Sequence, residues 1–494
     1  MGNPSSTLSI EEVVTEGFCV GCGACAATPS SPFEMTETST GTYTPLRVSK
    51  SDDRGERLAR YACPFSGVGP DEDQLAQAQF GELRRDGGIG SWRQIRAAHV
   101  TEGNFRELGT SGGMTSWFLA ELFRRDLIDA VIHVRANDDN DGPLFGYDLS
   151  TSPETSTSWV KSRYHVVEMS AAVELLRRNP GRFAFVGVPC FVKAVRLLVD
   201  TDEELRRNLV ATVALVCGHL KSARYAEFAA WQMGISPGNL SEFDFRTKIE
   251  GRPANLYAMT ASGTNPNRQS VTIRKGAEDI RWSDWGLGLF KLKACDYCDD
   301  VVGETADISM GDAWIPPYSA DWRGTNLVIT RSALAEEIVA GGEIAGAVHA
   351  VPLTAEDASA TQAAGLRHRR GGLAIRLAAR EQRGQFVPKK RVVPNPTGLN
   401  TPDGKRYLIR EQIAEASHLH YETAREQENL DVFFALMRAQ VKEYYGSTKA
   451  TALAWMIQRI EQLLPNRVLS VISKVHTERN DRRRRAREVR DQPR

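Results

Sequence analysis

The stretch from Phe183 to Val199, "FAFVGVPCFVKAVRLLV", joins a short apolar run to a pattern of longer period. "FAFVGV" has the length and composition of a buried strand, and "VKAVRLLV" repeats apolar residues at helical spacing. The same alternation runs from residue 92 to about 235, with "IRAAHV", "AVIHV" and "LVATVALV" as strands and "MTSWFLAELFRRDLI", "AAVELLRRN" and "ARYAEFAAWQM" as helices. The sequence therefore predicts an α/β fold (α+β overall) with a parallel, helix-covered sheet as its core.

A run of cysteines near the N-terminus, in "FCVGCGACA", has the C-x2-C-x2-C spacing, with Cys19, Cys22 and Cys25. Bacterial ferredoxins place cluster ligands at this spacing, so the run predicts an iron–sulfur cluster. Pro29 stands where the fourth cysteine of such a run would follow, and Cys63 in "YACPFSG" is the candidate for that ligand. Gly21 and Gly23 are expected to take positive φ as the loop curls around sulfur. A zinc site is the alternative, although zinc ligands usually come as two separated pairs.

The other half of the eight cysteines forms a second candidate set, Cys190, Cys217, Cys295 and Cys298. Cys190 and Cys217 each follow a predicted strand, and parallel strands bring their carboxyl ends to one edge of a sheet. The C-x2-C pair Cys295 and Cys298 can supply two more thiolates there, which gives a second complete cluster site. A buried free cysteine without a ligand role is the alternative for each taken alone.

Two loops are candidates for binding an organic cofactor. "GTSGG" leads directly into an expected helix, so the amides around Thr110, Ser111, Gly112 and Gly113 can hold a phosphate. A serine N-cap with glycines in the turn explains the motif as well. "VKSRYH" offers two cations and an aromatic ring suited to a pyrophosphate, Lys161, Arg163 and Tyr164, and a solvated loop is equally consistent.

His219 and Lys221 lie beside Cys217 and are the candidate catalytic residues. They can donate protons or pair with an anion, and a structural role is the alternative for both.

Composition limits the class of protein. The 494 residues carry 62 basic and 62 acidic side chains, so no global field recruits nucleic acid or an acidic membrane. No apolar stretch approaches the roughly 20 residues of a membrane helix, and we expect a soluble, cytoplasmic protein. In that compartment, eight cysteines favour metal or redox use over disulfides.

The pattern divides the chain into four parts. Residues 1–90 are expected to form a small ferredoxin-like iron–sulfur segment. Residues 91–335 form the α/β core, with β-like pieces "LSEFDFR", "LYAMTA" and "SVTIR" after residue 236. Residues 336–405, which include a Pro-rich basic stretch, are predicted to be a linker or arm. Residues 406–494 are a helical extension with a basic tail, which is either a solvated helix end or a docking site for an acidic partner or nucleic acid.

Several motifs in this order resemble the coenzyme F-420 hydrogenase/dehydrogenase beta-subunit family, to which 7-hydroxymethyl chlorophyll a reductase is also similar. They are "CVGCGACA…CP", "TSGGMTSWFLAEL", "FVGVPCFVKAVR", "LVCGHLKSARY", "DFRTK" and "ACDYCDDVVGETADISMGDAW". The resemblance covers about residues 15 to 335. It implies FAD near residues 109–116 and 161–164, and two [4Fe-4S] clusters, the second held by Cys190, Cys217, Cys295 and Cys298.

The resemblance implies an oxidoreductase that joins one-electron transfer to hydride chemistry at FAD. A ferredoxin-like or other one-electron carrier would then deliver electrons at the N-terminal cluster, and a small-molecule hydride acceptor or donor would react at the flavin. Coenzyme F-420 is one candidate for that molecule. The alternative from another class is a zinc-stapled binding or assembly module without redox activity. For the C-terminal helices, a homo-oligomer contact and a lid are both open.

Overall fold

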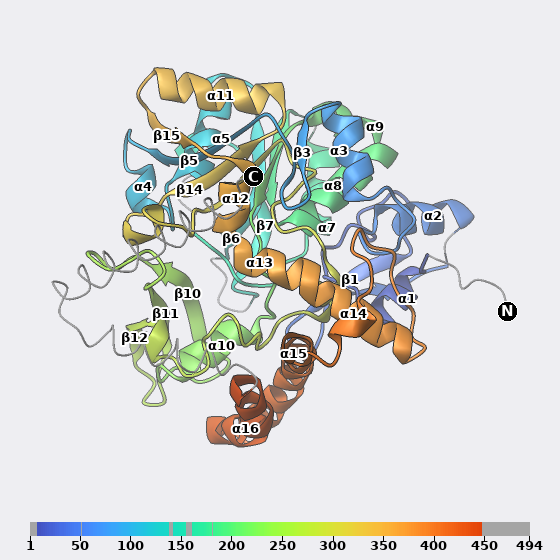
Figure 1. Cartoon of the computed structure of the whole chain (residues 1–494), viewed down its shortest axis with the longest axis vertical. Helices are drawn as coiled ribbons and strands as arrows, with labels where there is room; N and C mark the ends of the chain where they lie inside the picture. The colour runs from blue at the N-terminus through green and yellow to red at the C-terminus, as the bar shows by residue number, and fades with distance from the viewer. Residues whose placement is uncertain (1–6, 51, 138–141, 155–160, 180, 447–494) are drawn as a thin grey trace, which may run out of the picture. The chain divides into compact units, whose positions relative to one another are not determined.

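The computed structural model describes residues 7–50, 52–137, 142–154, 161–179 and 181–446 (Figure 1). The basic tail predicted at the C-terminus lies outside these ranges. Residues Met1–Arg438 form one compact unit and Ala439–Arg494 a second, and every site described below belongs to the first.

An eight-stranded sheet organises the first unit, with its strands in the order β15-β5-β14-β13-β9-β8-β6-β7. The strands are β5 (Gln94–Val100), β6 (Ala130–Ala136), β7 (Phe145–Ser150), β8 (Phe183–Gly187), β9 (Leu209–Leu215), β13 (Ile308–Asp312), β14 (Asn326–Thr330) and β15 (Val348–Pro352). At its centre, β13, β9, β8 and β6 pair in parallel, which confirms the predicted parallel core.

The outer strands depart from the predicted arrangement. β7 pairs with β6 antiparallel, and β14, β5 and β15 continue the other side antiparallel. The strand "IRAAHV" is therefore β5 of an antiparallel flank, which corrects its assignment to the parallel sheet. Between β13 and β14 the chain has only a 3₁₀ turn (Tyr318–Ala320) and no crossover helix, which agrees with their antiparallel pairing.

Helices cover the sheet: α4 (Phe105–Leu108), α5 (Met114–Arg124), α7 (Ser170–Arg178), α8 (Pro189–Thr201), α9 (Glu203–Asn208) and α11 (Ala333–Ile344). The helix α10 (Arg224–Trp231) packs instead against the strand β10 (Leu240–Thr247). Figure 1 draws α5 and α11 on the same side, and their residues Trp117, Phe118 and Ile338 share one buried cluster with β6, β9 and β14. Burying one such side chain stabilises the fold by about 1.5–3 kcal/mol, so this face supplies much of the core. α8 packs on β8 and β9.

A separate antiparallel sheet of three strands consists of β10 (Leu240–Thr247), β11 (Ala258–Thr264) and β12 (Ser270–Gly276). These are the three β-like pieces expected after residue 236. Smaller elements make up the N-terminal segment: α1 (Ile10–Thr15), β1 (Phe33–Glu37), β2 (Tyr43–Arg47), α2 (Asp53–Ala62), α3 (Glu72–Phe80), β3 (Arg84–Asp86) and β4 (Gly90–Trp92).

The segment 336–405, for which the sequence predicts a linker or arm, is largely structured. After α11 and β15 it contains α12 (Ala355–Thr361), α13 (Ala363–Arg367), a π-helical turn (His368–Gly372) and α14 (Leu373–Gln382). β15 extends the main sheet, and Leu373 and Leu377 of α14 are buried with Phe18 of the N-terminal segment. Only the Pro-rich stretch after α14 runs without a long element. The interaction partners of these residues are remote in sequence, which is why their local pattern looked like a connection.

The C-terminal part of the described chain is helical, as predicted, with α15 (Pro402–Glu426) and α16 (Leu430–Gly446). A search of the described residues finds no helix with the length and apolar character needed to cross a membrane.

Candidate functional site

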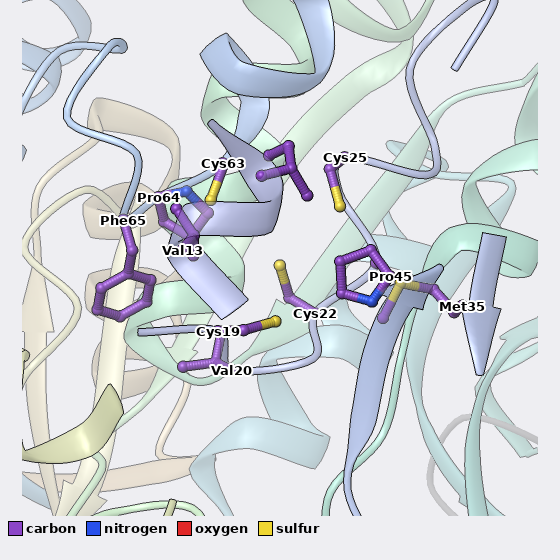
Figure 2. Close-up of a pocket in the computed structure, with 12 residues that line it drawn as sticks. Val13, Cys19, Val20, Cys22, Cys25, Met35, Pro45, Cys63, Pro64 and Phe65 are labelled. Atoms are coloured by element: carbon purple, nitrogen blue, oxygen red, sulfur yellow. The ribbon is translucent and has the colours of Figure 1, made fainter. Parts of the chain in front are cut away.

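The first cysteine set closes around one hollow. Cys19, Cys22 and Cys25 lie on the loop after α1, and Cys63 ends α2 as its C-cap. All four line a hollow of about 340 Å³ whose other walls include Val13, Val20 and Phe65. Figure 2 shows the four sulfur atoms turned toward the same space. The structure therefore brings together all four residues that the sequence grouped, Cys63 included.

The loop has the backbone conformation that the sequence predicts. Gly21 has φ 71° and Gly23 has φ 82°, both in the region that favours glycine. The Gly21 N–H donates to Cys19 Sγ at 3.3 Å, so an amide already points at sulfur.

Burial sets the protonation of these thiols. It raises the pKa of Cys19 to about 12, against a smaller lowering by the Gly21 amide, and it also raises the pKa of Cys22, Cys25 and Cys63. Negative charge on neighbouring thiols adds to the effect at Cys19, Cys22 and Cys25. Four thiolates in this space need compensating positive charge.

The second cysteine set closes around another hollow, of about 250 Å³. Cys190 lies in the first turn of α8 directly after β8, and Cys217 follows β9, the parallel neighbour of β8. Cys295 lies in a 3₁₀ turn (Lys293–Tyr297) and Cys298 just beyond it. All four line the hollow, so the sheet edge converts a separation of more than a hundred residues into proximity, as the strand pattern predicts.

Arg369 and Asp300 border this hollow as well, and the sequence reasoning missed both. Arg369 comes from the π-helical turn, and its side chain is almost completely buried. Its guanidinium Nη2 donates to the Gly218 carbonyl at 2.9 Å. Arg369 stands in a run of four basic residues, 367–370, and such a run usually indicates a solvated face, so the local sequence carries no signal for this position.

A third, larger hollow of about 980 Å³, part of it open to solvent, lies beside α5. Five predicted cofactor-binding residues line it: Thr110, Ser111, Gly113, Lys161 and Arg163. Thr110 Oγ1 and Ser162 Oγ are 2.9 Å apart, so a hydrogen bond joins the two predicted loops. Gly113 is the N-cap of α5 with φ 82°, and the helix start therefore faces this space.

The remaining two predicted residues are not among those lining the hollow. Gly112 packs against the sheet, where an added Cβ would lie 2.7 Å from the Ala98 carbonyl oxygen. The ring of Tyr164 packs on Trp285 at 4.7 Å between centroids and on Phe245 at 5.6 Å. Gly112 and Tyr164 therefore pack against residues next to the third hollow and do not line it.

Buried polar side chains give the third hollow its character. Burial lowers the pKa of Arg163 to about 10, and its Nε has no hydrogen-bond partner among the described residues. Lys161 Nζ lies 3.2 Å from Asp244 Oδ2. His133 and His165 also line the space, and burial lowers the pKa of each to about 4, so both are neutral at pH 7. Single histidines in apolar runs gave no sequence signal.

His219 and Lys221, the predicted catalytic residues, lie outside the linings of all three hollows. The His219 ring stacks on Trp285 at 4.2 Å between centroids, and Lys221 Nζ donates to the Leu289 carbonyl at 2.7 Å. Burial lowers the pKa of both well below its usual value. Neither residue lines any of these three hollows, and their catalytic role stays a prediction.

The three hollows adjoin one another in series. Val20 and Phe65 line both the first and the second hollow. Leu220 lines both the second hollow and the third. Single side chains therefore separate the first cysteine set from the second, and the second from the larger space.

This is the arrangement of an α/β protein with one thiol site at the carboxyl ends of its parallel strands and another on its N-terminal segment. Two family profiles match the chain: coenzyme F420 hydrogenase/dehydrogenase, beta subunit N-term, over residues 95–174, and the C terminus of the same subunit, over residues 181–356. The chain belongs to the coenzyme F420 hydrogenase/dehydrogenase beta-subunit family and is thereby an oxidoreductase of that class. The second cysteine set lies inside the matched residues, and the first set lies before them.

Among solved structures, the chain is similar to one from the F420-reducing [NiFe] hydrogenase complex of Methanosarcina barkeri. The identity is 16%, the TM-score is 0.45, and the alignment covers 61% of this chain and 97% of that one. No curated protein matches the sequence.

Proposed function

We propose that this chain is an FAD- and [4Fe-4S]-dependent oxidoreductase that couples one-electron exchange with a protein carrier to hydride exchange with a small molecule. The observation that carries the proposal is the series of adjoining hollows, two bordered by four cysteines each and one larger. Membership of the F420 hydrogenase/dehydrogenase beta-subunit family supports the same class of chemistry.

The chemistry of the donor sets fits two clusters. Four cysteines are the common ligand set of a [4Fe-4S] cluster, and each set surrounds a space instead of meeting at a point. Within the part of the chain that the structure describes, no group of three or more His, Cys, Asp or Glu is placed to hold a single metal ion. Iron would supply the positive charge that thiolates at these buried positions require.

The third hollow fits a flavin nucleotide. Its walls combine apolar side chains with a few polar and charged groups, which is the usual lining of pockets that bind cofactors. The first amides of α5, near Ser111 and Gly113, would bind phosphate, with Arg163 and Lys161 supplying positive charge. Arg163 has a buried Nε without a partner among the described residues, as expected of a donor that awaits a ligand. A bound flavin exchanges electrons singly or in pairs, whereas a cluster exchanges them one at a time.

The chain's own residues perform the positioning. Val20 and Phe65 separate the cysteine sets by the thickness of side chains, and Leu220 does the same between the second set and the larger hollow. These apolar walls keep water out of the space between neighbouring sites while allowing them to lie close together. The arrangement thus suits electron transfer between clusters, which exchange one electron at a time, and a flavin, which can exchange two.

The first test is anaerobic purification, with iron, acid-labile sulfide, zinc and flavin measured on one sample. About eight irons and one flavin per chain are expected, together with an electron paramagnetic resonance (EPR) signal after dithionite reduction. Zinc without iron or flavin would refute the proposal and favour the alternative, a zinc-stapled binding or assembly module. Flavin with about four irons would reduce the proposal to one cluster.

Coenzyme F-420 is the proposed hydride partner, and a ferredoxin-like protein the proposed one-electron partner. The family name supports the first choice. Anaerobic mixing of the flavin-loaded protein with the reduced coenzyme should restore the absorbance of the oxidised coenzyme. An intact flavin that does not react would refute F-420 as substrate and leave the search open to another hydride carrier.

A further inference from the structure

We propose that Arg369 is a positioning residue for the cluster of the second cysteine set, where its guanidinium donates N–H groups toward cluster or cysteine sulfur and raises the reduction potential. The inference rests on the proposed function, since it requires a cluster at Cys190, Cys217, Cys295 and Cys298. It goes further by assigning a role to a residue outside the matched family regions.

One nitrogen of the Arg369 guanidinium has a hydrogen-bond partner among the described residues, and the other two have none. It lines the same hollow as the four cysteines, and the residue is 1% exposed. Nη2 donates to the carbonyl oxygen of Gly218, the residue after Cys217, at 2.9 Å. Nε and Nη1 are buried and have no hydrogen-bond partner among the described residues. A buried guanidinium with unused donors is costly, so a negatively charged acceptor in the hollow is expected.

The acceptor is not Asp300, the carboxylate that borders the same hollow. Its oxygens accept from the backbone N–H groups of Val302, Gly303 and Glu304 at 3.0, 2.8 and 2.9 Å, and no ion pair joins it to Arg369 among the described residues. The remaining candidate acceptors that line this hollow are the sulfur atoms of the four cysteines.

The backbone around Arg369 supports a dedicated position. The residue lies in a π-helical turn between α13 and α14, and such turns interrupt α-helices frequently at functional sites. Arg376 Nη2 donates to the His368 carbonyl at 3.0 Å and so anchors the turn. The next residue, Arg370, faces elsewhere, since its Nη2 donates to the Gly87 carbonyl at 3.0 Å. Of these two adjacent arginines, only Arg369 lines the hollow of the second cysteine set, whereas Arg370 contacts the Gly87 carbonyl.

The effect on potential follows from charge. Reduction adds one electron to the cluster and moves no proton to Arg369, because a guanidinium stays charged. A fixed positive charge with N–H groups directed at sulfur stabilises the reduced state more than the oxidised one. Hydrogen bonds to sulfur and net charge are known to set cluster potentials, so removing the guanidinium should lower the potential.

The test compares Arg369→Gln, Arg369→Lys and the control Arg370→Gln with the unmodified, cluster-loaded protein. Each is titrated with dithionite and followed by EPR, with the first cluster as the internal reference. Arg369→Gln should lower the midpoint potential of the second cluster by about 59 mV, a tenfold change in the reduced-to-oxidised ratio for one electron. Arg369→Lys, which keeps the charge, should shift it less. Arg370→Gln should shift neither cluster.

An Arg369→Gln protein with full iron content and an unchanged second potential would overturn the inference. Equal shifts in both clusters would overturn it too, because they would show a general structural effect. If Arg369→Gln fails to assemble the second cluster, Arg369→Met, which also removes the charge, takes its place: a lowered potential supports the role, and an unchanged one refutes it. Absence of iron from the second set in the unmodified protein would instead refute the proposed function.

Discussion

Gly21 illustrates how a single residue fixes the geometry of the first cysteine set. Its φ of 71° is strained for any other residue, and an added Cβ would lie 2.7 Å from the backbone oxygen of Tyr43. Gly21→Ala therefore combines backbone strain with a clash that no side-chain rotation relieves. We expect the free energy of unfolding to fall by roughly 1–3 kcal/mol and iron content to fall with it. Denaturant unfolding of the anaerobic protein, with iron analysis, measures both.

Gly346→Ala is the matched control for this prediction. Gly346 has φ 73°, close to that of Gly21, and nothing lies within 4 Å of its added Cβ, so the substitution introduces strain alone. Iron content should stay unchanged, and the loss of stability should be smaller than at Gly21. Equal losses in the two variants would show that the contact with Tyr43 contributes nothing.

His133 makes stability depend on pH. Burial lowers its pKa to about 4, and its Nε2 lies 2.7 Å from Ser150 Oγ. Between pH 6.5 and 4 the unfolded chain binds a proton at His133 that the folded chain does not. The free energy of unfolding is therefore highest above pH 6.5 and decreases as the pH falls. Between pH 7.5 and pH 5, His133→Gln should make this decrease smaller by about 2 kcal/mol. Urea unfolding at both values tests this, and an equal pH dependence in the two proteins would contradict it.

Sequence reasoning grouped those residues that local spacing or neighbouring strand ends bring together in the structure. The cysteine triple and the two strand-end cysteines are of this kind, and so is the glycine-rich start of α5. Arg369 and His133 belong to neither class, because their roles come from burial, which tertiary packing alone decides. Tyr164 failed to reach the third hollow for the same reason: neighbouring aromatic rings surround it.

At the scale of elements, the stretch after α14 acts as a strap over the cysteine region. Phe386, Val387 and Val392 pack against the cluster of side chains that contains Cys19 and Cys63. Arg391 holds this stretch, residues 383–401, in place through three ion pairs. Its Nη1 lies 2.7 Å from Glu304 Oε2 and 2.8 Å from Asp73 Oδ1, and its Nε lies 3.3 Å from Asp299 Oδ2.

Removal of Arg391 should release this strap. Glu304 and Asp299 are each about 2% exposed, and Arg391→Ala leaves both carboxylates buried without this partner. Breaking such an arrangement from one side typically costs about 3–5 kcal/mol. Burial raises the pKa of Glu304 to about 7, while Arg391 opposes the rise, so the loss should be larger at pH 8 than at pH 6. Thermal or urea unfolding at both pH values is the measurement.

Arg406→Ala is the matched control for the strap. Arg406 pairs with Asp403 one helical turn away, and that aspartate is 71% exposed. An exposed pair of this kind contributes about 0.2–1 kcal/mol, so little stability should be lost at either pH. A loss in Arg391→Ala no larger than in this control would show that the strap is held by its apolar contacts alone.

The elements themselves were predictable where they carry a strong apolar period, as in β8, β9, α5 and α8. β7 has partly exposed residues through its middle and lies at the sheet edge, so its pattern is weak. The direction of β5 could not be predicted from its sequence either, because it depends on which strands pair with β5, and these strands, β14 and β15, are far away in the sequence. The segment 336–382 joins the sheet and the N-terminal segment through partners far away in sequence.

At the scale of the whole molecule, the three hollows divide the proposed reaction into two halves. The hollow of the first cysteine set shares no lining residue with the larger hollow, whereas the hollow of the second set shares Val20 and Phe65 with the first and Leu220 with the larger one. A change at the first set should therefore affect exchange with a one-electron carrier and leave the chemistry at the larger hollow intact. Cys63→Ser tests this division, because Cys63 borders only the first of the three hollows.

Cys63→Ser should lose about half of the iron and keep its flavin, since one of two four-cysteine sets is broken. Anaerobic stopped-flow absorbance of the flavin gives the two half-reactions separately, with reduced coenzyme F-420 as hydride donor and a reduced ferredoxin as one-electron donor. We expect the hydride half-reaction to be retained and the ferredoxin half-reaction to slow by about tenfold or more. Cys298→Ser, which breaks the second set, should slow the ferredoxin half-reaction as well. Full ferredoxin activity in an iron-depleted Cys63→Ser protein would mean that electrons reach the larger hollow without the first set, and the serial order of the sites would then have no functional meaning.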